Sequence, residues 1–244
     1  MILPRVVAPE TLDHLAADDP AAMRSRRDLR RVHRVMRTVS IVGDAIGASQ
    51  ALRRPEPFRV LELGAGDGTL MLRVAGAIGR VDAAVHLTLL DRLALIDPMT
   101  IDGYARLGWQ ADVATADVLE WAAISRLVSA PIVERWDLIV ANLFLHHFEG
   151  SELRSVLRAI ATRGDRLFAC EPRRSRLALV AAHLTGLIGA NAVTREDAVL
   201  SVHAGFRDDE LTATWQSFET GWTVREYGAG PFSHCFDASR RAVT

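Results

Sequence analysis

The sequence predicts an α/β protein built on an open, mostly parallel β-sheet. The first observation is a strand–turn–helix unit, in which the apolar run 58–63 is followed by a glycine-rich turn, 64–68, and a helix-forming run, 69–78. The second is a series of further strand-like runs, at 83–90, 109–113, 136–142 and 165–171. The third is a terminal antiparallel pair, 222–227 and 232–238, joined by 228–231. These runs add up to seven strands.

The glycine-rich turn is where a ligand should bind, because open parallel sheets bind ligands at the carboxyl ends of their strands. Its glycines stand at 64, 66 and 68, and glycine lets the backbone take a positive φ and approach a ligand closely. Dinucleotide folds use the spacing G-x-G-x-x-G, but position 69 is Thr. Glu62, just before the turn, would repel a pyrophosphate and would suit an ammonium group.

Polar residues also stand at or just after the carboxyl ends of the second, third and fourth predicted strands. Asp91 ends the second strand, and Asp117 follows the third, where Asp112 competes for the same role. The fourth strand ends at Asn142 and continues through 143–148, which contains the pair His146 and His147. Helices are predicted at 98–107, 151–162 and 208–217.

The first 55 residues are expected to form a helical extension ahead of a 56–244 domain. Residues 1–18 are predicted to be a weakly ordered lead, and a helix should begin at Asp19-Pro20, with Asp as N-cap and Pro at the first helical position. Helix is also expected over 40–52, before a linker at 53–57. The arginines between 24 and 37 indicate a solvated basic face or a lid that covers a ligand, and the two interpretations are compatible.

The run 175–188 is the most apolar part of the chain. A membrane span needs about 20 apolar residues, so a buried or lid helix is expected, with no stable membrane insertion. Weak contact with a membrane surface remains open. The segment 189–202 is expected to separate this helix from the next one.

The composition of the chain argues against several classes of function and of binding site. The net charge of −1 argues against a general nucleic-acid-binding protein. All 29 basic residues are arginine, which excludes Schiff-base lysines. Cys170 and Cys235 have no metal-ligand spacing, so no metal site is predicted, and buried free thiols in a reducing compartment are expected. No signal peptide is seen at the N-terminus, which favours a cytoplasmic location.

The glycine turn and the ordered strand-end residues resemble the class I S-adenosylmethionine-dependent methyltransferases over roughly residues 56–240. The resemblance implies a Rossmann-like sheet whose last strand is reversed, with S-adenosyl-L-methionine as cofactor. It implies that Asp91 accepts hydrogen bonds from the ribose, and that Arg92, Asp117 and Val118 lie at the adenine. The residues implied to bind the cofactor are Glu62, Gly64, Ala65, Gly66, Gly68, Asp91, Arg92, Asp117, Val118 and Asn142.

A narrower resemblance covers the C-terminal third. The segments 171–174, 191–195, 204–206 and 232–234 are similar to methyltransferases encoded beside bacterial type III polyketide synthases, which are thought to modify phenolic lipids. This resemblance implies a phenolic or polyketide-derived acceptor.

The predicted function is therefore methyl transfer to a small molecule, with oxygen as the favoured acceptor atom. His146 and His147 lie where the acceptor should approach, and a histidine with a pKa near 6.5 can remove its proton near neutral pH. Three alternatives stay open: carbon methylation of a quinone-like ring, a nicotinamide-dependent oxidoreductase, and a cofactor-binding module without catalysis. The sequence does not predict the oligomeric state.

Overall fold

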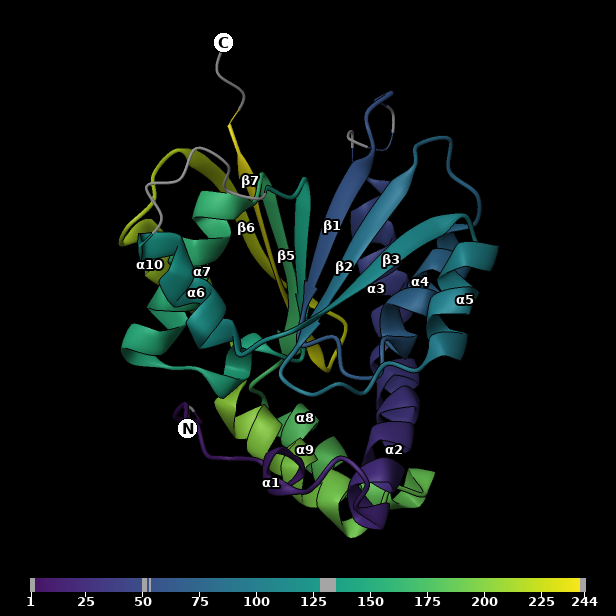
Figure 1. Ribbon diagram of the computed structural model, residues 1–244. Helices are drawn as coiled ribbons and strands as arrows, with labels where there is room; N and C mark the ends of the chain where they lie inside the picture. Colours follow the sequence, from purple (N-terminus) through teal and green to yellow (C-terminus); the bar gives the residue numbers. More distant parts are fainter. Residues whose placement is uncertain (1–2, 50–51, 53, 128–134, 242–244) are drawn as a thin grey trace.

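A single sheet of seven strands forms the centre of the molecule (Figure 1). The computed structural model describes residues 3–49, 52, 54–127 and 135–241. The strand order is β3-β2-β1-β4-β5-β7-β6, and β7 runs antiparallel to both β5 and β6. The mostly parallel sheet with a reversed last strand is thus confirmed. The strands are β1 (Phe58–Leu63), β2 (Val85–Asp91), β3 (Trp109–Thr115), β4 (Leu138–Asn142), β5 (Arg166–Pro172), β6 (Trp222–Ala229) and β7 (Ser233–Arg240).

Helices cover both faces of the sheet, because the inner strands are apolar on both sides. In β1, Val60 packs into one buried cluster, while Leu61 and Leu63 pack into the other, as the alternation of side chains along a strand requires. The helices are α3 (Thr38–Gly47), α4 (Thr69–Ile78) and α5 (Pro98–Arg106) on one face, and α6 (Val118–Leu127), α7 (Gly150–Arg163) and α10 (Glu210–Gln216) on the other (Figure 1).

A third group of helices lies beyond the carboxyl ends of the parallel strands, in the lower part of Figure 1. We call it the lid. It combines the N-terminal segment with the chain that follows β5, and its α9 packs against α1, α2 and α8. The lid helices are α1 (Thr11–His14), α2 (Pro20–Met36), α8 (Arg176–His183), the 3₁₀ turn η3 (Thr185–Ile188) and α9 (Ala192–Ala204).

The lead before α2 is held in place by hydrogen bonds, contrary to the prediction that it is weakly ordered. The Val6 amide donates to the His203 carbonyl (3.1 Å), and the amides of Thr11 and Leu12 donate to the Asp197 carboxylate (2.8 and 3.0 Å). Asp19 caps α2 as predicted, accepting from the Ala21 amide at 2.7 Å. The sequence does not indicate that the lead is ordered, because its hydrogen-bond partners lie on α9, about 190 residues away.

Two details of the lid differ from the sequence-based expectation. The predicted connection 189–202 contains α9, which is capped by the Asn191 side chain accepting from the Thr194 amide at 2.8 Å. Its buried residues include the polar Thr194 and Asp197, so no apolar stripe marks it as a helix in the sequence. The predicted helix 175–188 is split, with α8 ending at His183 and η3 following. Within the described ranges, no helix is long and apolar enough to cross a bilayer.

Candidate active site

A cavity of about 680 Å³ lies between the carboxyl ends of the strands and the lid. One wall is the turn after β1. Gly64 has φ +71°, and a Cβ added there would lie 2.3 Å from Cδ2 of Phe144, so only glycine fits. Ala65 and Gly66 also line this wall. Gly68 begins α4 behind it, with φ +70° and its carbonyl accepting from the Tyr104 hydroxyl at 2.6 Å.

Glu62 brings an unpaired carboxylate oxygen into this cavity. The residue is 2% exposed, and its Oε2 has no hydrogen-bond partner among the described residues. Burial, and then the charges of Asp91 and Asp67, hold the pKa of Glu62 well above its usual value. A buried polar atom without a partner costs free energy, and a ligand that brings a donor or a positive charge would remove that cost.

Asp91 lies beside the glycine turn and stabilises it. One of its carboxylate oxygens accepts from the Gly66 amide at 2.8 Å and the other from the Leu93 amide at 2.9 Å. Each carboxylate oxygen can accept more than one bond, so hydroxyl groups of a ligand can still be held here. Arg92 turns toward the lid, where it donates to the carboxylate of Asp13 at 3.0 Å.

The segment after β3 forms the neighbouring part of the cavity wall. Ala116, Asp117 and Val118 line the cavity. Asp112, the competing acidic residue, is exposed and lies in register with Thr88 within the sheet. One carboxylate oxygen of Asp117 accepts from the Leu119 amide at 2.6 Å, so the residue also stabilises the start of α6.

The chain after β4 is strained. Leu143 has φ +49°, which is rare for a bulky residue and costs about 1–3 kcal/mol. The buried carboxylate of Glu171 stabilises this strained segment by accepting hydrogen bonds from the amides of Phe144 (3.1 Å) and Leu145 (2.9 Å). Strain of this kind is concentrated at functional sites, and Asn142, whose Oδ1 is buried without a partner among the described residues, precedes it directly.

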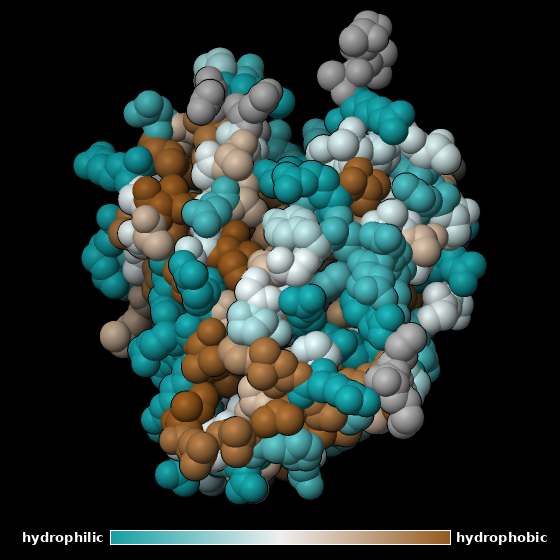
Figure 2. Space-filling view, turned by 180° about the vertical axis from the view of Figure 1, so that it is seen from behind, coloured by the Kyte–Doolittle hydropathy of each residue, from teal (hydrophilic) through white to brown (hydrophobic). Residues whose placement is uncertain are grey.

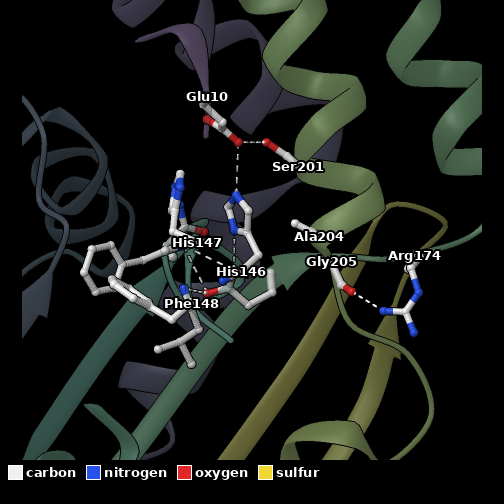
Figure 3. A network of polar contacts seen from close by, with 12 residues as sticks. Glu10, His146, His147, Phe148, Arg174, Ser201, Ala204 and Gly205 are labelled. Atoms are coloured by element: carbon white, nitrogen blue, oxygen red, sulfur yellow. Dashed lines mark hydrogen bonds and ion pairs between the residues drawn. The ribbon is translucent and has the colours of Figure 1, made fainter. Parts of the chain in front are cut away.

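His146 is held between the carboxylates of Glu171 and Glu10, and Figure 3 shows the contact with Glu10. Its Nδ1 lies 2.8 Å from Oε2 of Glu171, and its Nε2 lies 3.4 Å from Oε1 of Glu10, which also accepts from the Ser201 hydroxyl. Burial alone would lower the pKa of His146, but the two carboxylates outweigh burial and raise the pKa to about 9. His146 is therefore an imidazolium at neutral pH, and it ties the N-terminal lead to β5.

His147 has the opposite electrostatics. Burial, and then the positive charge of His146, lower the pKa of His147 below its usual 6.5. Its ring lines the cavity, with its centroid 4.3 Å from that of His146, and its Nδ1 is 3.5 Å from Oδ2 of Asp13. His147 is therefore neutral at pH 7 and can accept a proton.

Three lid residues in this site were not found from the sequence. Glu10 contacts His146, Ser201 donates to Glu10, and His33 of α2 lies in the cavity with its Nε2 3.5 Å from Nδ2 of Asn142. Burial, and then the charge of Arg73, lower the pKa of His33 to about 4. None of the three stands in a motif, so no local pattern in the sequence could have found them.

Solved structures that resemble this chain include methyltransferases. The plantazolicin methyltransferase BpumL in complex with SAH (S-adenosylhomocysteine) has a TM-score of 0.60 at 11% identity, over 92% of each chain. The magnesium protoporphyrin IX methyltransferase of Synechocystis PCC 6803 with bound SAH has a TM-score of 0.50 at 17% identity, over 88% of this chain and 86% of that one. The mitomycin 7-O-methyltransferase MmcR has a TM-score of 0.52 at 18% identity, over 92% of this chain and 59% of that one. No family model and no curated protein matches the sequence.

The chain has the class I methyltransferase fold. At these identities the similarity establishes the fold. On this fold, the predicted cofactor-binding residues other than Gly68 all line one cavity, and the predicted histidine pair lines it too. The strand-end residues lie on the sheet side, and the histidines lie toward the lid.

Proposed function

We propose that the protein is an S-adenosylmethionine-dependent methyltransferase that acts on a small molecule. The observation that carries the proposal is the buried Oε2 of Glu62, which has no hydrogen-bond partner within the described part of the chain, in a cavity that also contains Asp91, Asp117 and the histidine pair. The ammonium of the cofactor's methionine part would donate to this oxygen, and its positive charge would lower the pKa that burial raises, so that Glu62 binds it as a carboxylate. The methyltransferase fold supports the same conclusion.

The remaining cavity residues fit the rest of such a cofactor. The Asp91 carboxylate only accepts hydrogen bonds, and so it suits the two ribose hydroxyls. The Asp117 carboxylate suits the exocyclic amine of adenine, and the Val118 amide suits a ring nitrogen. When bound, the cofactor supplies an activated methyl group. The chain then has to orient the acceptor, and orientation can lower the barrier by about 7–11 kcal/mol.

We assign proton removal from the acceptor to His147, because it is the member of the pair that is neutral at pH 7. Asp13 near Nδ1 favours the tautomer with the proton on Nδ1, which leaves Nε2 to accept the acceptor's proton. His146, held as an imidazolium, positions His147 and the lid. A phenolic or polyketide-derived oxygen is the acceptor we favour, and a similar protein named as a 7-O-methyltransferase supports oxygen.

The test is a transfer assay with radiolabelled methyl donor across phenols, quinones and carboxylates, with the methylated atom determined in each product. We expect label on the oxygen of a phenol. Label on a ring carbon of a quinone would establish carbon methylation instead. Absence of transfer to every class, with intact cofactor binding, would favour a module without catalysis.

Replacement of Asp91 by alanine should weaken binding of S-adenosylhomocysteine by about 1.5–3 kcal/mol, because charge-assisted bonds to the ribose are lost. Calorimetry measures the change, and Asp112→Ala is the matched control, since Asp112 is exposed and has no role in the proposal. Equal affinities for the two folded variants would show that Asp91 does not hold the ribose.

A further inference from the structure

Helix α8 and η3 direct most of their large apolar side chains toward solvent, although Leu179 is partly buried. The alanines of α8, Ala178 and Ala182, are buried, whereas Leu177 is 61% exposed and Leu187 of η3 is 82% exposed. A surface helix normally shows the reverse arrangement. Exposed apolar patches of this kind mark interaction sites. We call this surface the α8–η3 patch, and it consists of Leu177, Val180, Leu184, Leu187 and Ile188.

The patch continues into the cavity. Leu184, Leu187 and Ile188 are exposed and also line the cavity, as do Val35 and Arg30 on the facing helix α2. The exposed lining residues of η3 and α2 form one rim of the cavity within an apolar surface, and we call the opening at this rim the mouth. In the view from behind, apolar residues gather over the lower end of the molecule, where the lid lies (Figure 2).

Positive charge surrounds this apolar surface. Arg31 of α2 donates to the Gly189 carbonyl at 3.4 Å, and the Arg195 side chain lies against Gly186. From residue 172 to residue 195 the chain carries no acidic residue and four arginines, of which Arg174 is buried and paired with Glu210. Helix α2 carries six arginines and one aspartate, Asp28, which pairs with Arg31. Apolar side chains framed by arginines complement a layer of anionic headgroups over acyl chains.

We infer that the α8–η3 patch binds the surface of an anionic phospholipid membrane, so that the cavity mouth opens onto the lipid. A second copy of the chain fits the patch less well, because a symmetric contact would bring Arg31 and Arg195 of both copies together. The membrane contact itself does not depend on methyl transfer. If the protein is the methyltransferase proposed above, membrane contact at the mouth implies that the methyl acceptor is an amphiphile that enters the cavity from the membrane.

Cosedimentation of the whole protein with vesicles tests the inference. We expect binding to phosphatidylcholine vesicles that contain phosphatidylglycerol, and binding weaker by about tenfold or more to phosphatidylcholine alone. Leu177→Glu and Leu187→Glu should each reduce binding to the anionic vesicles by about tenfold or more. Met99→Glu is the matched control and should bind like the wild type, because Met99 is 76% exposed but lies on α5, outside the α8–η3 patch. Arg195→Gln should weaken binding more than Arg154→Gln on α7.

Three results would overturn the inference: wild-type protein that stays in the supernatant, equal loss in Met99→Glu and the patch variants, or a wild-type dimer in light scattering that Leu187→Glu dissociates. The last result would assign the patch to a second copy. Binding of S-adenosylhomocysteine by the same variants shows that they are folded. If none of them, nor the wild type, binds that compound, the proposed function fails while the vesicle result still stands.

Discussion

His147→Gln is expected to lower the rate of methyl transfer by roughly 10²–10⁴ while leaving cofactor affinity nearly unchanged. The loss follows because the variant has no group at this place that can accept the acceptor's proton. It should shrink as the pH approaches 10, where a phenol ionises without help. Single-turnover methyl transfer measured against pH provides the test.

The pH profile of the wild type separates the two histidines. With His147 as base, the acidic limb of the rate lies below pH 6.5, because the pKa of His147 is lowered. With His146 as base, the limb lies near pH 9. A limb near pH 9, or full activity in His147→Gln at pH 7, would contradict our assignment.

A chelator control belongs in the same assay. Glu10, His146 and His147 bring one potential ligand atom each to within 4.8 Å of one another, a grouping that could also hold a metal ion. Our account explains the grouping by the ion pairs of His146, and it predicts that EDTA leaves the rate unchanged. Loss of activity with EDTA and recovery with Zn²⁺ would assign these side chains to a metal.

His146→Ala is expected to destabilise the protein by about 3–5 kcal/mol, because it leaves Glu10 and Glu171 buried without the positive charge between them. Denaturant unfolding measures the change, and His183→Ala is the control, since His183 is exposed at the end of α8. Stability like that of the wild type in His146→Ala would show that the imidazolium does not hold the lid.

The same ion pairs predict how stability depends on pH. The pKa of His146 is raised from 6.5 to about 9, so the folded state holds its proton more tightly than the unfolded state does. The stabilisation is fully present below pH 6.5 and is lost as the pH rises through about 9. Unfolding of His146→Ala should lack this alkaline loss, whereas His183→Ala should retain it.

The sequence predicted the sheet side of the site because its signals are local. The glycine turn, Asp91 and Asn142 stand at strand ends, where alternating apolar runs mark the boundaries. The lid side could not be predicted in this way. Glu10 meets Ser201 and His146 only through tertiary packing, and contacts across 130–190 residues leave no periodic pattern.

The roles of the two histidines show the same limit. Adjacent in sequence, they were both expected to have an ordinary pKa near 6.5. In the fold, two carboxylates surround His146, while His147 lies beside its positive charge, so the two pKa values move in opposite directions. The carboxylates of Glu10 in the lid and Glu171 on β5 therefore determine which histidine is neutral at pH 7 and can act as a base.

Calorimetric titration of the wild-type protein with S-adenosylhomocysteine and, separately, with NADH tests the central claim most directly. We expect binding of S-adenosylhomocysteine and no binding of NADH, because Glu62 at the glycine turn suits an ammonium and repels a pyrophosphate. Tight binding of NADH without a response to S-adenosylhomocysteine would contradict it.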